Sequence, residues 1–378
     1  MRLTCLQDNL SRALNIVGRA VATRTTLPVT QNVLLSTDQG RLKLTATNLE
    51  IAISTWIGAK VENEGAITVP ARLLTDFVSS LREGQLDIAM TPSPLGIQLT
   101  CGRSEGRLLG TDAEEFPPIP MVEEGIGISV QPQTLRTAIN QVVFAAATEE
   151  SRPVLTGIKM ELEGDKIVFA AADGFRLAVH TGTLTSPIAE PTSYIIPSRT
   201  LMELNRLLAD QEDPVEFTVT PQRSQAMFRL KNVELVSQLV QGTFPDYQQL
   251  IPQSHGTRTI VALQAFSQAA RTASIFARDG SGIVRLEVVP GSADSGGKMI
   301  ISARADEMGD NTGEIDAVVE GEGARIAFSS KYLSDVLSVI SQDEVALETT
   351  TPSSPGIIRP IGTNNYVHVV MPMFVQWE

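Results

Sequence analysis

The stretch that organises this chain is Gly242-Thr243-Phe244-Pro245-Asp246-Tyr247-Gln248-Gln249-Leu250-Ile251-Pro252. Its two prolines remove backbone donors and fix φ, so the stretch is predicted to be neither a helix nor a central strand. A loop this apolar must pack between other elements or present a surface to a partner. A related stretch, Phe116-Pro117-Pro118-Ile119-Pro120, lies one-third of the way along, and Val369-Val370-Met371-Pro372-Met373-Phe374 lies near the end. This regular spacing predicts three units.

The bulk composition is that of a globular protein with more than one core. The chain has 378 residues, of which 42% are hydrophobic and 19% charged, which is enough for two or three domains. The formal net charge of −13 argues against nucleic acid as a partner, unless the cations are gathered on one surface.

The sequence predicts no export signal and no membrane span. Met1-Arg2-Leu3-Thr4-Cys5-Leu6 has no long apolar segment after its charge, and no run approaches the length of a span. Two cysteines, Cys5 and Cys101, are too few for a disulfide framework in a chain of this length. We expect free, buried thiols in a cytoplasmic protein.

Helical spacing of apolar residues predicts six helices, over 10–21, 71–82, 135–146, 198–208, 266–277 and 330–340. Asp8 is the expected N-cap of the first. In the first unit alternation predicts strands at 2–6, 85–90 and 95–101, and Asp38-Gln39-Gly40 is the expected turn of a hairpin.

A shift of about 125 residues superimposes the second unit on the first. Pro153-Val154 then repeats Pro28-Val29, and Asp173 falls on Asn48. The third unit repeats the pattern more loosely, with Asp335 where Asp76 falls. Any α+β domain contains helices and strands in some order, but matched turns and prolines at a constant offset favour true repetition. The period is too long for a solenoid and predicts an α+β domain repeated three times.

The six predicted helices are basic although the chain is acidic. They carry nine Lys or Arg against three Asp or Glu, a net +6 that leaves −19 for the remainder. If the helices share one surface, that surface attracts phosphates without reading bases. Arg is also a good helix former on a solvated face, but Glu is equally good and occurs only once in these helices.

The sequence offers no pattern of catalytic or metal-binding residues. His180, His255 and His368 have no second ligand at metal spacing, and neither a nucleophile elbow nor a nucleotide-binding loop is present. Ala172-Asp173-Gly174 could place a carboxylate at a strand end, but a turn explains it more simply. No cofactor or metal is therefore expected.

The motifs taken together resemble the family of the bacterial DNA polymerase III beta subunit, the replicative sliding clamps, over the whole chain. They are LPVTQNVLL near residue 27, TATNLEIAI near 45, VPARLL near 69, ADGFRLAVH near 172, FPDYQQLIP near 244 and the terminal YVHVVMPM.

The resemblance implies an α+β fold of three clamp domains, 1–120, 121–253 and 254–378, each with two helices packed on antiparallel sheets. Two chains would join head to tail into a ring around duplex DNA. The implied function is that of a non-catalytic processivity subunit in the cytoplasm, at the nucleoid. Implied partners are duplex DNA without sequence preference, a second copy, a clamp loader, and replicative and repair polymerases and other proteins that carry the clamp-binding motif.

Site residues follow from the resemblance residue by residue. For DNA they are Arg24, Arg72 and Arg199. For a cleft that takes partner peptides they are Leu155, Ala172, Gly174, Phe175, Arg176, Leu177, Pro245, Leu250, Val369, Met371, Pro372 and Met373. Ala172 and Phe175 replace residues that are commonly Thr and His, which makes the rim more apolar. Methionines suit a site with many partners because they repack cheaply.

For the contact between two copies the resemblance implies Phe77 and Leu81, four apart on one helix, against Ile275 and Phe276. Gly106 stands where the family often has a bulky apolar residue, so this contact is expected to be weaker or repacked. Two other hypotheses are a ring-shaped protein-binding scaffold without DNA, and an enzyme with an unrecognised site, which would need clustered polar residues with perturbed pKa values.

Overall fold

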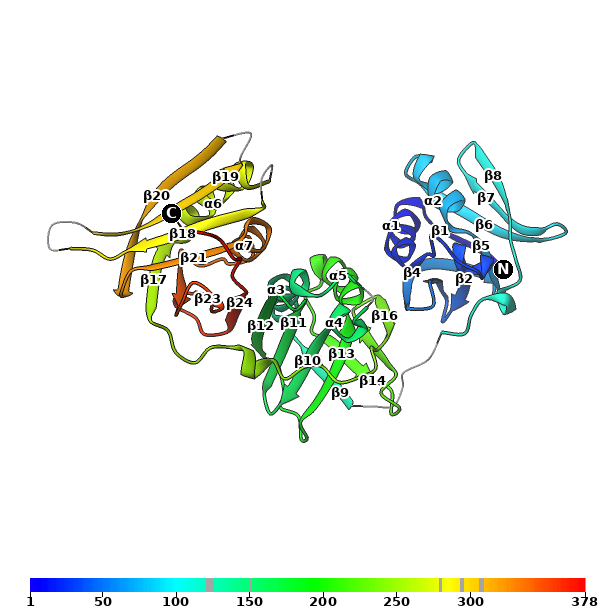
Figure 1. Cartoon of the computed structure of the whole chain (residues 1–378). Coiled ribbons are helices and arrows are strands. Elements are labelled where there is room, and N and C mark those ends of the chain that lie inside the picture. Colours follow the sequence, from blue (N-terminus) through cyan, green and yellow to red (C-terminus); the bar gives the residue numbers. More distant parts are fainter. Residues whose placement is uncertain (120–125, 150, 279–280, 293–295, 306–308, 378) are drawn as a thin grey trace. The chain divides into compact units, whose positions relative to one another are not determined.

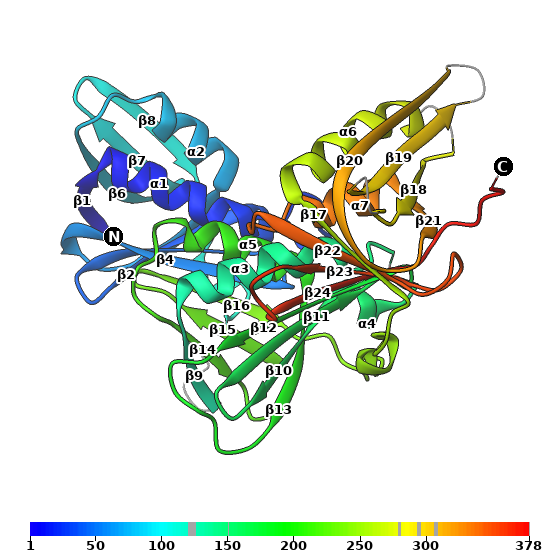
Figure 2. The ribbon, with the colours of Figure 1, turned by 90° about the vertical axis from the view of Figure 1, so that its left-hand side faces the viewer.

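The computed structural model describes residues 1–119, 126–149, 151–278, 281–292, 296–305 and 309–377. By its internal contacts the chain divides into two compact units. Unit 1 comprises Met1–Pro132 and Arg199–Leu239, and unit 2 comprises Gln133–Ser198 and Val240–Glu378. Each unit holds a twelve-stranded antiparallel sheet with helices packed on it (Figures 1 and 2).

Unit 1 is built on the strand order β8-β7-β6-β1-β4-β16-β15-β14-β9, with β2, β3 and β5 branching from β4. Its strands are β1 (Arg2–Leu6), β2 (Asn32–Asp38), β3 (Arg41–Thr47), β4 (Ile51–Asn63), β5 (Ala66–Pro70), β6 (Gln85–Pro92), β7 (Leu95–Cys101), β8 (Ser104–Leu109), β9 (Ile126–Val130), β14 (Val215–Val219), β15 (Gln225–Arg229) and β16 (Val233–Gln238). Its helices are α1 (Gln7–Val17), α2 (Ala71–Ser80) and α5 (Ser198–Leu207), with 3-10 turns at Gly18–Ala20, Pro28–Gln31, Ala113–Glu115 and Leu208–Asp210.

Unit 2 follows the order β13-β10-β11-β12-β24-β23-β22-β17-β20-β19-β18-β21. Its strands are β10 (Gly157–Glu163), β11 (Lys166–Ala172), β12 (Arg176–Thr183), β13 (Thr192–Pro197), β17 (Thr257–Ala262), β18 (Ile283–Val289), β19 (Gly297–Ala305), β20 (Gly309–Gly321), β21 (Ala324–Ser329), β22 (Glu344–Thr349), β23 (Gly356–Pro360) and β24 (Tyr366–Val370). Its helices are α3 (Pro132–Val142), α4 (Pro153–Thr156), α6 (Leu263–Arg278) and α7 (Ser330–Leu337), with 3-10 turns at Val143–Ala145 and Tyr247–Leu250.

All six predicted helices are confirmed, and each buries its apolar stripe against a sheet. The first helix of each repeat buries residues seven apart at matching positions, namely Leu10 and Val17 in α1, Leu135 and Val142 in α3, and Phe266 and Ala273 in α6. The prediction for Asp8 was wrong. Helix α1 begins at Gln7 after Leu6, and Asp8 lies in its first turn, where it pairs with Arg12 and complements the helix dipole.

The threefold repeat is confirmed by backbone hydrogen bonds that recur at matching places. Each bond ends on the residue three positions before the second helix of its repeat. The three bonds run from Thr111 N to Thr68 O at 2.9 Å, from Val240 N to Ile195 O at 2.9 Å, and from Met373 N to Ala327 O at 2.7 Å.

The side chains of Asn48 and Asp173 close the same turn in two repeats. Asn48 Oδ1 accepts hydrogen bonds from Glu50 N and Ile51 N at 3.0 and 2.9 Å, and Asp173 Oδ1 accepts them from Phe175 N and Arg176 N at 2.9 and 3.0 Å. The interpretation of Asp173 as a turn residue is therefore confirmed.

Sheet continuity across the predicted domains explains why two units form. Strand β16 of the predicted second domain pairs with β4 of the first, with Val233 opposite Thr55 and Ser237 opposite Ile51. Strand β12 pairs in the same way with β24 of the third, with Arg176 opposite Val370. The second domain is thus shared between the units. The predicted boundary at 120 and 121 lies outside the described residues.

Strands β8, β19 and β20 are among those that the sequence pattern did not locate. Strand β8 contains Ser104, Glu105 and Gly106, which lack the apolar alternation of a strand, and it forms because β7 pairs with it. Strands β19 and β20 form a long hairpin whose register runs from Gly297 opposite Ala317 to Ala305 opposite Gly309. Pairing with the preceding strand, and not the pattern of its own residues, decides β8.

Both cysteines are free, as predicted, but only Cys5 is buried. Burial, followed by the neighbouring charge of Asp87, raises the pKa of the Cys5 thiol to about 12. The prediction of burial was wrong for Cys101, which is partly exposed because it ends strand β7.

Candidate functional site

The predicted cleft residues divide into a buried floor and an exposed rim within unit 2, which together we call the docking patch. The floor consists of Leu155, Ala172, Leu177 and Val369, which belong to one hydrophobic cluster, together with Arg176. Leu177 stands opposite Val369 in the pairing of β12 with β24. The junction of two repeats therefore builds the floor.

The rim exposes an unusual amount of apolar surface. Phe175 is 59% exposed, Leu250 53%, Met371 43% and Met373 39%, and Pro245 is exposed while Pro372 is partly buried. The backbone joins two parts of the rim, because Met371 N donates a hydrogen bond of 2.8 Å to Phe175 O. Exposed apolar side chains gathered over an apolar floor are typical of a protein-binding surface.

Gly174 adopts φ +95°, a conformation that favours glycine. A Cβ at this position would lie 3.1 Å from Nη1 of Arg152. Arg152 was missed by sequence reasoning, and only this contact across the turn reveals it. A cation thus lies beside the apolar rim.

Arg176 is held by partners from three segments and has its side chain 5% exposed. Its guanidinium contacts Asp173 Oδ2 at 3.0 Å, Asp335 Oδ2 at 2.6 Å and the carbonyl of Phe144 at 2.6 Å. The guanidinium carbon also lies 4.3 Å from the ring centroid of Tyr332 and 5.3 Å from that of Phe144. Arg176 therefore serves to fix the turn that carries Phe175.

The stretch 242–252 anchors itself through two buried aromatic rings. Phe244 and Tyr247 join the cluster that forms the floor and leave Pro245 and Leu250 exposed. The Tyr247 hydroxyl donates to the Glu161 carboxylate, which also pairs with Lys159 at 2.6 Å. The loop packs down, which is one of the two alternatives expected for it, and it also leaves Pro245 and Leu250 exposed.

Two buried histidines lie under the helices of unit 2. Burial is the main reason why the pKa of His180 is lowered to about 4. Burial and then the charge of Arg176 lower the pKa of His368 to about 3. Both imidazoles are therefore neutral near pH 7.

The three predicted DNA contacts are exposed in unit 1. Arg24 lies in the loop between α1 and β2, and Arg72 and Arg199 are each the second residue of their helix. Arg72 is 3.9 Å from Asp76, and Arg199 is 3.8 Å from Glu50. Ion pairs this long and this exposed are weak, so both guanidinium groups remain available to phosphates.

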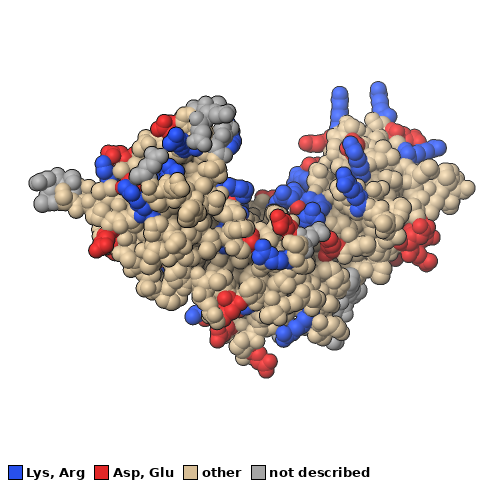
Figure 3. Space-filling view, viewed as in Figure 1, with Lys and Arg blue, Asp and Glu red and all other residues tan. Residues whose placement is uncertain are grey.

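The helices are basic, but less so than predicted. With their adjoining 3-10 turns, the six long helices carry nine Lys or Arg and five Asp or Glu. The difference arises because Asp8 and Asp210 lie inside the observed bounds. Figure 3 shows Lys and Arg side chains on the α1 and α2 side of unit 1. A cavity of ≈ 640 Å³ between α1 and α5 is lined by Arg12, Arg19, Arg206 and Lys231, among others.

The residues predicted for the contact between copies lie on two separate elements. Phe77 is half-buried on α2, and Leu81 follows the end of that helix at Ser80 instead of lying within it. On α6, Ile275 is 56% exposed and Phe276 is half-buried. A Cβ on Gly106 would lie 2.4 Å from Cζ of Phe77.

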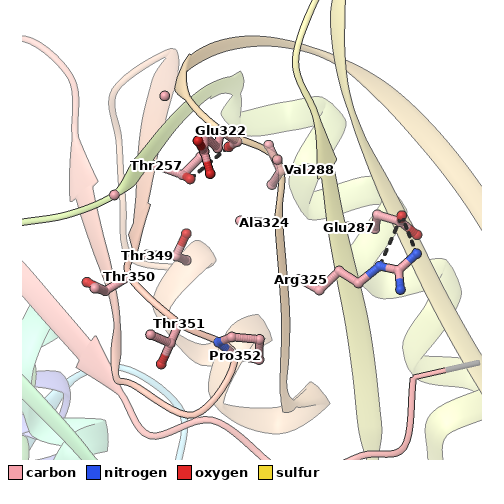
Figure 4. A pocket seen from close by; sticks show the side chains of 13 residues that line it. Thr257, Glu287, Val288, Glu322, Ala324, Arg325, Thr349, Thr350, Thr351 and Pro352 are labelled. Atoms are coloured by element: carbon pink, nitrogen blue, oxygen red, sulfur yellow. Dashed lines mark hydrogen bonds and ion pairs between the residues drawn. The ribbon is translucent and has the colours of Figure 1, made fainter.

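A second cavity of ≈ 640 Å³ lies in unit 2 beside β21 (Figure 4). Thr257, Thr349, Thr350 and Thr351 surround it with Glu322, and Glu287 pairs with Arg325 at 2.8 Å on one side. None of the described residues that line it is a histidine or lysine that could activate a hydroxyl.

The described residues also hold no group of metal ligands, and none of their helices is long and apolar enough to cross a membrane.

Comparison with known proteins covers the whole chain. Models of the DNA polymerase III beta subunit match its N-terminal domain at residues 1–120, its central domain at 129–246 and its C-terminal domain at 248–374. The beta sliding clamp of Bacillus subtilis is 32% identical over 382 residues, and that of Synechococcus elongatus is 30% identical over 376, each with 99% of both chains covered.

Solved structures agree. A crystal structure of the Bacillus subtilis DNA polymerase sliding clamp superimposes with a TM-score of 0.94 at 30% identity and full coverage of both chains. The Pseudomonas aeruginosa clamp bound to griselimycin superimposes with a TM-score of 0.91 at 28% identity, over 99% of this chain and 100% of the other. With three clamp domains matched from end to end, the chain belongs to the DNA polymerase III beta subunit family, the beta sliding clamps.

Proposed function

We propose that two copies of this chain close head to tail into a ring that encircles duplex DNA and holds a polymerase on it. The observation that carries the proposal is the way in which repeats join inside the chain. Both internal junctions, β4 with β16 and β12 with β24, are continuous antiparallel sheets. The same junction, made between two copies, would close the structure. Head-to-tail contacts form a ring when the rotation from copy to copy closes, and otherwise they extend indefinitely.

Both strands needed for that junction have a free edge. Among the described strands β8 pairs only with β7. Strand β20 pairs with β19 along Gly309–Ala317 and with β17 only from Val318 onward. By the repeat, β8 corresponds to β16 and β24, and the start of β20 corresponds to the starts of β4 and β12. An unpaired edge invites a strand from another chain.

A closed ring needs only weak contacts with DNA. Arg24, Arg72 and Arg199 would meet phosphates without reading bases, and such contacts weaken as salt rises. Closure supplies the retention, so weak contacts favour sliding. This role needs no catalytic group. Loading would depend on a separate ATP-driven loader, and the work would take place in the cytoplasm at the nucleoid.

The docking patch would tether replicative and repair polymerases and other proteins through a short apolar peptide. The exposed rim over an apolar floor supports this assignment, and the Pseudomonas aeruginosa relative has been solved with griselimycin bound. We further propose domain boundaries at 1–120, 121–253 and 254–378, since each range then contains one repeat.

The test of the ring is retention on DNA after assisted loading, with a closed circle compared to the same DNA linearised. We expect retention on the circle and loss from the linear form, which only topological linkage explains. Equal loss from both would mean that the ring does not close around DNA. Equal, salt-sensitive retention on both would mean ordinary electrostatic binding, and the proposal would be withdrawn.

A further inference from the structure

Gly106 occupies a position that carries a large buried side chain at both internal junctions. Leu109, Gln238 and Met371 are equivalent, because each lies two residues before the donor of the recurring hydrogen bond. That bond ends on the residue three positions before the second helix. Three residues earlier on the same strands lie Gly106, Leu235 and His368. Leu235 and His368 are both 0% exposed. The third junction, between copies, thus lacks the side chain that fills the other two.

Phe77 compensates for the missing side chain. It is the seventh residue of α2, where α5 has Leu204 and α7 has Val336, both 0% exposed. A Cβ on Gly106 would lie 2.4 and 2.7 Å from Cζ and Cε1 of Phe77, so the aromatic ring already fills that space. At the same two positions the second repeat carries Leu204 with Leu235 and the third Val336 with His368, whereas the first carries Phe77 with Gly106.

The internal junctions also indicate what covers Phe77 in a ring. At each internal junction, one residue contacts the next repeat, at either its second helix or its last strand. This residue lies two positions after the last of the matching buried residues of the first helix. Arg19 lies 3.6 Å from Glu203, and the rings of Phe144 and His368 lie 5.5 Å apart. The third equivalent is Ile275, which is 56% exposed. Its counterparts across the junction are α2 and β8 of a second copy.

Leu73 is a further member of this surface that was not predicted for the contact between copies. It is the third residue of α2, as Tyr332 is of α7, and Tyr332 packs against Arg176 across its junction at 4.3 Å. Leu73 is 54% exposed. Its exposure and its equivalence to a junction residue both place it against the second copy.

We propose that Phe77 and Gly106 form a matched pair that packs the contact between two copies, with Leu73 beside it and Ile275 of the second copy covering it. The proposal rests on the proposed ring. It specifies that the aromatic group comes from helix α2 instead of strand β8. A side chain at 106 is then excluded for as long as Phe77 is present, because overpacking a filled site is costly.

The test measures self-association by sedimentation for Gly106→Phe, Phe77→Ala and the double variant. We expect each single change to weaken association roughly tenfold or more. The double variant should recover most of the affinity, because Phe at 106 then fills the space vacated at 77. Leu73→Ala should weaken association as well.

Gly106→Ala and Gly58→Ala provide a matched pair of controls. Both glycines lie on strands of unit 1, but a Cβ on Gly58 meets nothing within 4 Å, so only Gly106→Ala should alter association. Thermal unfolding of each variant checks that it folds. The pairing is overturned if Gly106→Phe associates as tightly as the original chain, or if the double variant is no better than Phe77→Ala. If the original chain does not associate at all, the ring itself is overturned.

Discussion

His368 shows at the scale of one residue how burial makes the fold sensitive to acid. Its pKa is lowered to about 3 in the folded chain, against 6.5 for the exposed group. The unfolded chain therefore binds the additional proton between these values, and stability is lost as pH falls below about 6.5.

We expect His368→Leu to remove this part of the pH dependence. Leu is the residue found at the equivalent position 235, so the junction should accept it. Between pH 7 and pH 5 one such histidine accounts for about 2 kcal/mol of lost unfolding free energy. Urea unfolding of the original chain and of the variant at both pH values measures the loss. An unchanged dependence in His368→Leu would contradict the assignment.

Asp335 is the acidic partner of Arg176 that links α7 to the docking patch. We expect Asp335→Asn to lower the free energy of unfolding by about 1–3 kcal/mol, because it weakens a charged hydrogen bond to a buried guanidinium. It should also loosen the turn that carries Phe175, and so weaken peptide binding.

Asp76→Asn is the matched control, since Asp76 is the equivalent residue of α2 and its partner Arg72, 3.9 Å away, has a side chain that is 95% exposed. Its cost should stay within about 0.5 kcal/mol. Urea unfolding and peptide titration of both variants decide the matter. Equal losses of unfolding free energy and of peptide affinity in the two variants would show that the burial of Arg176 does not strengthen its contact with the acidic partner.

At the scale of elements, the segment after β24 provides much of the rim of the docking patch. Met371 and Met373 follow the strand with side chains 43% and 39% exposed. We expect changing both to Ala to weaken binding of a clamp-binding peptide by at least about tenfold per residue, since buried apolar anchors dominate such contacts. Self-association should be unchanged.

Met202→Ala is the control for this change. Met202 lies on α5 and is 40% exposed, so it matches the two methionines in kind and exposure but not in place. Peptide titration beside sedimentation measures both properties. If the double change leaves peptide affinity as it was, the assignment of the patch is wrong.

At the scale of the whole molecule, the exposed cations on and beside the helices of unit 1 should determine how the protein responds to salt. Reversing Arg24, Arg72 and Arg199 to Glu should weaken binding to a short linear duplex and reduce the slope of affinity against salt by about three. The control reverses Arg2, Lys60 and Lys298, which lie on strands. A scaffold that does not bind DNA would respond to neither change, and fluorescence anisotropy across a salt series separates the cases.

The sequence by itself determined the repeat, its six helices and the apolar character of the stretch 242–252. These are local properties. Periodicity marks the buried face of a helix, and prolines and turn residues end elements wherever they occur. The residues proposed for the docking patch were likewise named from the sequence, because their motifs are short and continuous.

Only the tertiary structure decided the features that join segments far apart in the chain. The partners Asp335 and Phe144 of Arg176 and the fit of Phe77 to Gly106 depend on which surfaces meet. Gly106 alone suggests a missing side chain. The structure shows the ring of Phe77 in its place, because core packing is a property of the assembled neighbourhood and no single segment encodes it.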